Sequence, residues 1–472
     1  MKRTKIVCTI GPATAEKGRL RELFAAGMNV ARLNFSHGSH DWHAERIRLL
    51  RELESEEGRP IAILQDLCGP KLRIGEVPQD GIELLPGREC LLSTESFDPG
   101  PPLPRIPIPL AGLLDALQVG GVVYMDDAQI ELEVLGRSRN GVRCRVQHGG
   151  RLLSRKGITT PGASFQIDSL TEKDLRDAAF GIAAGVDYIG VSFVRQASDM
   201  DPVRALIADE DADTRIIAKI EKPEALVNLS SILSAADGLM VARGDLGVEV
   251  PLHQLPILQK EIIRAANAVG KPVITATQML ESMILNPRPT RAEVTDVANA
   301  IFDGTSAVML SGETAMGKFP VETVRMMAAT AEYAEAHLPY QRLLQQAVAA
   351  NATSRTEAIT QGVTEIAVDL DAVAILCSTS SGETARQFAR MRSPLFIIAG
   401  TSSIATYRRL ALLWGISPVL VPETTNGEER IAALVQAARS AKWILPGQTV
   451  AIATGISVGT AGGTNGFRME TI

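Results

Sequence analysis

The chain has 472 residues, of which 45% are hydrophobic and only 4% aromatic, and its formal net charge is −6. A chain of this length predicts roughly three domains rather than one core. The composition is typical of an α/β enzyme built on Ala, Val, Ile and Leu. Because the net charge is negative, we expect no nucleic acid and no anionic membrane as a partner.

The five cysteines are scattered, odd in number and free of any Cys-x-x-Cys pair. This pattern argues against a disulfide framework or a structural zinc site and favours a reducing compartment. Met1-Lys2-Arg3 leads directly into an apolar strand, and no apolar run reaches the length that crosses a bilayer. We therefore expect a soluble, cytoplasmic protein.

Short apolar runs that predict strands alternate with segments of helical spacing. Strands are expected at Lys5–Thr9, Val30–Asn34, Ile61–Gln65, Tyr188–Phe193, Ile216–Ile220, Leu239–Ala242, Val273–Ala276 and Ala307–Leu310. Helices are expected at Leu20–Ala26, Asp41–Glu57, Thr171–Ala184, Asp199–Glu210, Pro223–Ala236, Leu252–Val269, Arg291–Phe302 and Val321–His337. Eight such strands close a parallel (β/α)₈ barrel. Thr171 and Asp174 are expected to form a capping box at the start of their helix.

The barrel pattern is interrupted after its third strand. From residue 69 to 168, short alternating runs such as Val122–Met125, Ile130–Leu135 and Val142–Val146 predict a small antiparallel β-barrel domain. Its proline-rich stretch Pro101–Pro107 is interpreted as a rigid surface loop. After Pro339, strands at Val373–Cys377, Leu395–Ala399, Val419–Val421 and Val450–Ala453 predict a separate α/β sandwich. The expected domains are residues 1–68 and 169–338 for the barrel, 69–168 for the insertion and 339–472 for the last unit.

The segment Arg215–Leu246 is the most informative part of the sequence. Lys219 and Glu221 end one strand, and Asp245 follows the next. Since the carboxyl ends of parallel strands meet at one rim, these side chains are expected to converge there. Two carboxylates on neighbouring strand ends can hold Mg²⁺, and Lys219 would complement a bound phosphoryl group. The alternative is a surface lysine beside two solvated acids.

Polar residues follow nearly every expected barrel strand, at the end where barrel enzymes have their active sites. They are Thr9, Arg32, Asn34, Ser36, Asp66, Lys219, Glu221, Gly244, Asp245, Thr277, Ser311 and Glu313.

The motifs that contain these residues make the chain resemble the pyruvate kinase family from end to end. They are Thr9-Ile10-Gly11-Pro12-Ala13, the run from Ala31 to Gly38, Asp66-Leu67-Cys68-Gly69-Pro70-Lys71, Lys219-Ile220-Glu221, the run from Ala242 to Gly247, the runs 276–283 and 288–300, and Met309 to Thr314. The resemblance implies phosphoryl transfer from phosphoenolpyruvate to ADP, giving pyruvate and ATP. It also implies that the insertion closes over the active site as a lid, which would exclude water.

The resemblance further implies a role for each site residue. Lys219 would stabilise the transferring phosphoryl group, and Glu221 and Asp245 would bind Mg²⁺, with Mn²⁺ as a substitute. Arg32 and Arg73 would grip phosphate, and the amides of Ala242, Gly244 and Asp245 would hold the substrate carboxylate. Thr277 would orient that carboxylate and a proton-relay water, or else would only cap its own helix. Asn34, His37, Arg73 and Lys156 would meet the nucleotide.

His37, His40 and His43 are spaced three residues apart, which raises the question of zinc. A loop that enters a helix at this spacing gathers no tetrahedral set, so we favour one nucleotide contact and two surface histidines.

Lys71 departs from the pattern usual in the family. By resemblance, K⁺ would lie among Asn34, Ser36, the Asp66 carboxylate and the Leu67 carbonyl, with a Glu in the position of Lys71. An ammonium tethered there would replace the ion, so we expect activity without K⁺. The alternative is that Lys71 points to solvent and K⁺ still binds. The lid stretch Asp126-Asp127-Ala128-Gln129 also departs from the usual Asp-Asp-Gly.

The loop Ser378-Thr379-Ser380-Ser381-Gly382-Glu383-Thr384 follows a strand and opens a helix. Hydroxyls at a helix N-terminus suit a phosphate, and the loop resembles the family's effector site, so a phosphorylated metabolite is the expected effector. The competing interpretation is a simple helix cap, with Glu383 opposing an anion. Because the run from Thr454 to Gly466 lacks the Trp and Arg of members that respond to fructose bisphosphate, we do not expect that effector.

Two other functions remain open. The first is another Mg²⁺-dependent barrel enzyme acting on pyruvate or phosphoenolpyruvate, such as an aldolase or lyase, for which Arg73, Lys156 and the insertion would have no use. The second is a non-catalytic effector-binding homologue, which would have lost site residues. Family resemblance implies a homotetramer.

Overall fold

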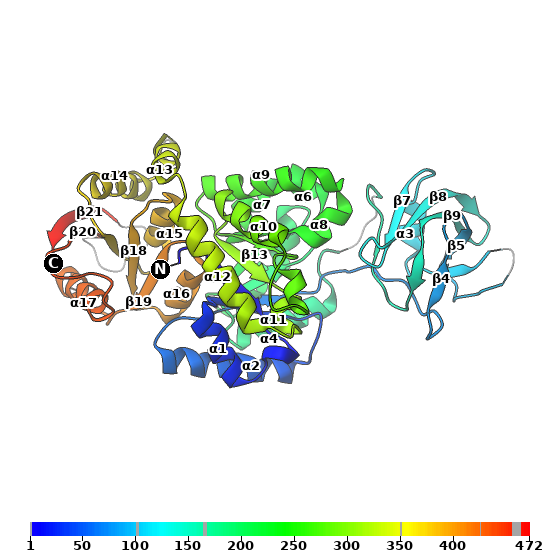
Figure 1. The fold of residues 1–472 in the computed structure, drawn as a ribbon, viewed down its shortest axis with the longest axis horizontal. Coiled ribbons are helices and arrows are strands. Elements are labelled where there is room, and N and C mark those ends of the chain that lie inside the picture. Colours follow the sequence, from blue (N-terminus) through cyan, green and yellow to red (C-terminus); the bar gives the residue numbers. More distant parts are fainter. Residues whose placement is uncertain (1, 101–102, 164–167, 350–351, 425, 456–463) are drawn as a thin grey trace.

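The computed structural model describes residues 2–100, 103–163, 168–349, 352–424, 426–455 and 464–472. Figure 1 shows a central barrel, the inserted β unit at one end of the molecule and the C-terminal α/β unit at the other. Among the described residues, no helix combines the length and the apolar character needed to cross a membrane.

Eight parallel strands close the barrel in the order β1-β16-β15-β14-β13-β12-β3-β2. They are β1 (Lys5–Thr9), β2 (Val30–Asn34), β3 (Ala62–Asp66), β12 (Tyr188–Val191), β13 (Arg215–Ile220), β14 (Gly238–Ala242), β15 (Val273–Ala276) and β16 (Ala307–Leu310). The predicted (β/α)₈ barrel is confirmed, with each strand within two residues of its expected bounds. The reason is that these apolar runs are buried on both sides, as a barrel requires.

Alternation along each strand divides the core into two layers. Val7 and Met240 point into the barrel interior, whereas Ile6 and Leu239 pack outward against the helices. Ala411 and Leu412, from the C-terminal unit, belong to the interior cluster. The barrel is therefore filled with side chains and leaves its polar rim as the place for chemistry.

The helices around the barrel follow the expected periodicity. They are α1 (Lys17–Ala26), α2 (His40–Glu57), α4 (Glu172–Ala183), α5 (Asp201–Asp209), α6 (Pro223–Val227), α7 (Leu229–Ala235), α8 (Arg243–Glu249), α9 (Leu255–Ala268), α10 (Arg291–Phe302), α11 (Gly312–Ala315) and α12 (Pro320–Ala336), with 3₁₀ turns η1 (Pro12–Thr14), η2 (Ala197–Met200), η3 (Leu252–Gln254) and η4 (Glu281–Ile284). The capping box of Thr171 and Asp174 is confirmed.

Two details of this helix prediction are corrected. The helix expected over Pro223–Ala236 is broken at Asn228 into α6 and α7. The short helices α8 and α11 were not predicted, because segments of one or two turns show too little periodicity to be recognised.

The inserted unit contains β4 (Ile82–Leu84), β5 (Glu89–Ser93), β6 (Arg105–Pro107), α3 (Ala111–Ala116), β7 (Val122–Met125), β8 (Ile130–Ser138), β9 (Gly141–His148), β10 (Gly150–Leu152) and β11 (Ile158–Thr159). Six strands form a sheet in the order β11-β7-β8-β9-β5-β6, and β10 pairs with β4. These pairs are antiparallel except β5 with β6, which run parallel. Part of the expected surface loop is thus a strand, since Arg105–Pro107 forms β6; Pro101 and Pro102 lie outside the described residues.

The C-terminal unit has a five-stranded sheet in the order β19-β18-β17-β20-β21. Its elements are α13 (Tyr340–Ala349), α14 (Arg355–Asp369), β17 (Ala374–Ser378), α15 (Glu383–Arg390), β18 (Phe396–Thr401), α16 (Ile404–Arg409), η5 (Leu410–Leu412), β19 (Ile416–Leu420), α17 (Gly427–Ser440), β20 (Thr449–Thr454) and β21 (Gly466–Thr471). The four expected strands are present. The edge strand β21 was not predicted, because Arg468 and Glu470 interrupt its apolar character.

Candidate active site

Lys219 lies at the centre of a buried cluster of charges at the carboxyl end of the barrel. Its Nζ is 2.9 Å from Glu221 Oε1 and 3.2 Å from Asp66 Oδ1. It also donates a hydrogen bond to Ser192 Oγ at 2.6 Å. The other Asp66 oxygen accepts from Arg32 Nε at 2.6 Å. Three barrel strands thus bring two cations and two carboxylates together, and a fourth adds the Ser192 hydroxyl. This burial excludes the interpretation of Lys219 as a surface residue.

Burial and mutual attraction act against each other in this cluster. Burial lowers the pKa of Lys219, but attraction from Asp66 and Glu221 outweighs it and raises the pKa above its usual value. Burial raises the pKa of Asp66, but Lys219 and Arg32 reverse the shift and lower it. For Glu221, burial raises the pKa, Lys219 opposes the rise and Asp245 adds to it. Lys219 is therefore a permanent cation.

Ser192 and Phe193, which the sequence analysis did not select, connect the cluster to strand β12. Ser192 Oγ donates to the carbonyl of Leu67 at 2.8 Å, and the Phe193 amide donates to Glu221 Oε2 at 2.7 Å. Phe193 holds a φ of +54°, which is strained for an aromatic residue. Ser192 could have been predicted from its position, because it is a polar residue at the end of the fourth barrel strand, for which no site residue was predicted.

Asp245 faces the same rim from the first turn of α8, and its side chain is 38% exposed. The neighbouring amide of Gly244 donates to Thr277 Oγ1 at 2.9 Å, and that hydroxyl donates to the carbonyl of Ala276 at 2.7 Å. Thr277 is thus bound to the β14 turn rather than serving as a cap of its own helix, and it holds a φ of +67°. Ala242 ends β14 directly beside it.

Arg243, a residue without a predicted role, stabilises this turn. Its guanidinium donates to the carbonyls of Ala276 and Thr277 and pairs with Asp296 at 2.7 Å. Its side chain is only 10% exposed. The Ala-Arg-Gly-Asp motif contained Arg243, but its contacts with a neighbouring strand and with α10 could not be read from sequence.

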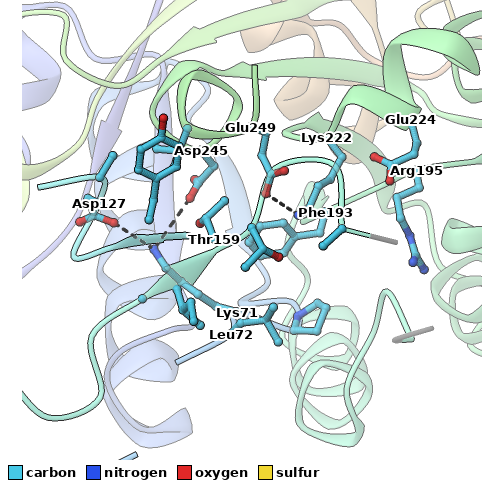
Figure 2. Close-up of a pocket in the computed structure, with 18 of the residues that line it drawn as sticks. Lys71, Leu72, Asp127, Thr159, Phe193, Arg195, Lys222, Glu224, Asp245 and Glu249 are labelled. Carbon is cyan, nitrogen blue, oxygen red and sulfur yellow. Dashed lines mark hydrogen bonds and ion pairs between the residues drawn. The ribbon is translucent and has the colours of Figure 1, made fainter. Parts of the chain in front are cut away.

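A cavity lies between the barrel rim and the inserted unit, next to Asp245. It is lined by Lys71, Asp127 and Thr159 on one side and by Phe193, Lys222 and Glu249 on the other. Figure 2 shows Lys71 reaching between Asp127 of the insertion and Asp245 of the barrel. Its Nζ is 3.8 Å from a carboxylate oxygen of each. Lys71 therefore links the two units across the opening.

The other two insertion cations with an expected role, Lys156 and Arg73, are engaged within the insertion. Lys156 Nζ lies 2.7 Å from Asp126 Oδ1, and Arg73 donates to the carbonyl of Arg155 at 2.9 Å. Asp126, Asp127 and Ala128 have φ values of +52°, +52° and +65°. A left-handed conformation is unfavourable for Ala, which explains why glycine suits this position.

The expected potassium groups lie around the end of β2. The Asn34 side chain accepts from the Ser36 amide at 3.1 Å, Asp66 holds Arg32 and Lys219, and the carbonyl of Leu67 accepts from Ser192. The ion pairs of Lys71 among the described residues are with Asp127 and Asp245 instead. Lys71 is therefore next to Asp245, one of the two predicted magnesium ligands.

The histidines behave differently from one another, and the expectation of two surface histidines is wrong. The side chain of His40 is half-exposed and its Nε2 lies 2.7 Å from Asp177, whereas His43 is 2% exposed. His43 stacks on Phe35 at a centroid distance of 3.8 Å. Within the described part of the chain, no three His, Cys, Asp or Glu side chains form a metal-ligand group.

The hydroxyl loop after β17 is divided between two cavities. Ser378, Thr379 and Ser380 line a cavity of about 480 Å³ together with Arg430 of α17. Arg430 was not predicted, because it is far away in sequence; it donates to Ser378 Oγ at 3.4 Å. Ser381 and Gly382 line a different cavity at the barrel junction.

The last two residues of the loop do not face the Arg430 cavity. Thr384 is buried against Thr464, with 2.6 Å between the hydroxyl oxygens. The charge of Glu383, which seemed to oppose an anion, is paired with Arg386 at 2.7 Å. Of the run 456–463, where the absent Trp and Arg were noted, nothing is described.

Comparison with known proteins agrees with this geometry. Residues 1–324 match the family model "Pyruvate kinase, barrel domain", and residues 357–469 match "Pyruvate kinase, alpha/beta domain". The pyruvate kinase of Geobacillus stearothermophilus is 45% identical over 474 aligned residues, which cover 100% of this chain and 80% of the relative. The pyruvate kinase of Sporosarcina psychrophila is 42% identical, with 100% and 81% covered, and pyruvate kinase 2 of Synechocystis sp. is 42% identical, with 100% and 79% covered.

Proposed function

Since the chain belongs to the pyruvate kinase family and is a phosphotransferase of glycolysis, we propose that phosphoenolpyruvate and ADP react at the rim where Lys219, Glu221 and Asp245 meet. The observation that supports this site best is the position of Lys219 Nζ, 2.9 Å from Glu221 and 3.2 Å from Asp66. A cation held this firmly stabilises developing negative charge without further reorganisation. An aldolase or lyase has no need for the three cations supplied by the insertion.

The reaction moves one phosphoryl group between two oxygens. A β-phosphate oxygen of ADP attacks phosphorus, the bond from phosphorus to the enol oxygen breaks, and the enolate left behind takes a proton at carbon to give pyruvate. Lys219 and Arg32 compensate the charge on the phosphoryl oxygens during transfer. Thr277, with the amides of Ala242, Gly244 and Asp245, orients the substrate carboxylate so that a water beside Thr277 reaches the enolate carbon.

Mg²⁺ fits the carboxylates at this rim. Glu221 is buried and repelled by Asp245, as its raised pKa shows, so a divalent cation between them would relieve the repulsion. Mg²⁺ commonly takes one or two carboxylates and completes its shell with water and substrate oxygens. When bound, it would polarise substrate oxygens; Mn²⁺ is the proposed substitute.

The nucleotide is proposed to bind where the insertion meets the end of β2. Asn34 and His37 lie on the barrel side, and Arg73 and Lys156 lie on the lid. Lys156 is held by Asp126, so closure would have to exchange that ion pair for a phosphate. Such an exchange would make lid closure depend on bound nucleotide.

The test is a coupled assay of the purified chain with phosphoenolpyruvate and ADP, with and without Mg²⁺. We expect pyruvate and ATP to form in equal amounts, and only with the metal present. Absence of pyruvate under all metal conditions, from a folded protein, would support the non-catalytic alternative.

Activity without K⁺ is proposed as well. Lys71 of the insertion brings a positive charge to the rim, 3.8 Å from Asp245. We expect wild type to be active without K⁺ and Lys71→Glu to require it. Activation of wild type many-fold by KCl, with ionic strength held constant by a tetraalkylammonium salt, would contradict this proposal.

A phosphorylated metabolite is proposed to bind in the Arg430 cavity. Hydroxyls of Ser378, Thr379 and Ser380 and the Arg430 guanidinium together suit a phosphate. Sugar phosphates and nucleoside monophosphates should lower the apparent KM for phosphoenolpyruvate, and Arg430→Gln should remove the response. Thr384→Glu is unsuitable as a test because Thr384 is buried. If none of these metabolites changes the apparent KM of wild type for phosphoenolpyruvate, the loop is only a helix cap.

The remaining family expectations are also proposals. The sheets support a division into residues 1–68 with 169–338, 69–168 and 339–472. A homotetramer and a cytoplasmic location are proposed from the resemblance; sedimentation of the purified protein tests the first.

A further inference from the structure

Two side chains form hydrogen bonds with main-chain carbonyls of the loop that follows β2. Lys173 Nζ of α4 donates to the carbonyl of Phe35 at 2.7 Å, and His43 Nε2 of α2 bonds the carbonyl of His37 at 2.9 Å. The same loop carries His37, and Asn34 ends β2 directly before it. Its conformation therefore depends on two bonds to main-chain oxygens that have no part in the transfer of phosphate.

We propose that His43 is a positioning residue for the nucleotide, a latch whose buried ring holds the His37 segment in its binding conformation and leaves its site when a proton on Nδ1 would remain there without an acceptor. This inference rests on the proposed nucleotide role of the segment. His43 would contact neither substrate nor metal, and it would act through the carbonyl of His37.

The surroundings of His43 define its protonation state. A carbonyl oxygen can only accept, so Nε2 must carry the hydrogen. His43 Nδ1 is buried and has no hydrogen-bond partner among the described residues. The ring lies against Phe35 at an interplanar angle of 9°, and Trp42 meets it edge-on. A second proton would place a buried N–H without an acceptor, which is unfavourable.

Charged groups reach His43 from each side. Its own helix contributes His40, α4 contributes Lys173 and Asp177, and the loop contributes the exposed His37. Burial lowers the pKa of His43, as do His40 and Lys173, while the bond to His37 and the charge of Asp177 oppose the shift. Because the folded state disfavours the proton, the latch loses stability as pH falls below the ordinary histidine value of about 6.5.

Close packing also limits the alternatives for the loop. Gly38 has a φ of +81°, and a Cβ added there would lie 3.2 Å from His43 Nε2. The loop therefore passes directly against the imidazole edge, and a larger or displaced side chain at position 43 would move it.

The test compares two variants of His43. The Nε2 of Gln can donate to the same carbonyl but does not titrate, whereas Leu cannot donate. At about pH 7.5, we expect His43→Leu to raise the KM for ADP about threefold to tenfold, as loss of one hydrogen bond implies. The KM for phosphoenolpyruvate should change less than about twofold, and His43→Gln should stay near wild type.

A pH series adds a readout that a purely structural role would not change. Between about pH 7.5 and 5.5, the KM for ADP of wild type should rise, while that of His43→Gln should remain flatter. The exposed His253→Gln is the matched control and should follow wild type. If His43→Leu does not fold, the comparison of wild type with His43→Gln still decides the matter.

The outcomes separate this inference from the nucleotide assignment. An unchanged KM for ADP in folded His43→Leu, or identical pH profiles of wild type and His43→Gln, would overturn the latch. His37→Ala leaves the carbonyl in place, so an unchanged KM for ADP in that variant would overturn only the proposed contact of the His37 side chain.

Discussion

The barrel rim and the inserted unit both present cations to the same opening, but they hold them differently. Lys219 is 11% exposed and is fixed by Asp66, Glu221 and Ser192. Lys71 and Lys156, both on the inserted unit, are 35% and 37% exposed. The barrel thus supplies a preorganised charge, and the insertion supplies charges that must be brought into place.

The difference follows from the environment of each charge. Attraction between buried charges is weakly screened, so the Lys219 cluster keeps its geometry independently of substrate. Partly exposed pairs such as Lys156 with Asp126 are worth little in water and can exchange partners. We expect removal of the Lys219 charge to slow chemistry and removal of the Lys156 charge to weaken nucleotide binding.

The largest effect is expected for Lys219→Met. Removal of this preorganised charge should lower kcat by about 100-fold or more, or roughly 3 kcal/mol. Lys156→Met should mainly raise the KM for ADP, with a smaller effect on kcat. Steady-state kinetics of both variants, with the distant Lys260→Met as control, measure the contrast. A folded Lys219→Met within about tenfold of wild type would refute the assigned role.

Changes to the carboxylates should act on the metal. Glu221→Gln and Asp245→Asn keep the shape of each side chain but remove the charge that Mg²⁺ needs. Titration of activity with Mg²⁺ should therefore show a large increase in the midpoint for both. If neither midpoint moved, the metal would have to bind elsewhere.

The pH dependence should also separate the two regions. The pKa of Glu221 is raised by burial and by Asp245, although Lys219 opposes the rise. Protons therefore compete with Mg²⁺ above the ordinary carboxyl value of about 4.5, and the Mg²⁺ midpoint should increase as pH falls toward it. By linkage, this carboxyl contributes less to stability as pH rises through its folded pKa. The increase should be absent in Glu221→Gln; the same midpoint at every pH in wild type would contradict the prediction.

The smallest predicted effect concerns the strained turn of the insertion. Ala128 has a φ of +65°, which costs about 1–2 kcal/mol for a residue other than Gly. Ala128→Gly should therefore stabilise the turn by about 0.5–1 kcal/mol after the greater unfolded-state entropy of Gly is subtracted. Hydrogen exchange of the insertion measures this change. Ala116→Gly, at the last residue of α3, should have the opposite sign, and equal effects of both variants would contradict the strain argument.

Sequence patterns were sufficient to predict the barrel strands that carry the site residues. The barrel strands are continuous apolar runs, and the polar residue at the end of each run was sufficient to select Lys219, Glu221 and Asp66. Ser192 was missed because a single hydroxyl in an apolar run resembles a core residue. Arg243 and Arg430 were missed because their partners lie on elements far away in the sequence.

The errors have the same physical origin. His43 was expected at the surface because its spacing from His37 and His40 gathers no metal set, whereas packing against Phe35 and Trp42 buries it. Thr384 was expected in the effector loop, but the first turn of α15 directs it toward Thr464. In both residues, the direction of the side chain depends on tertiary contacts that periodicity does not contain.

We propose that barrel residues alone position the metal and the transferring phosphoryl group. The most direct test is anomalous diffraction from Mn²⁺ in crystals grown with a non-reactive phosphoenolpyruvate analogue. We predict one peak bonded to carboxylate oxygens of Glu221 and Asp245, at about 2.0–2.3 Å, with Lys219 Nζ at hydrogen-bond distance from the phosphoryl oxygens. A peak bound elsewhere, or an analogue out of reach of Lys219, would contradict the account.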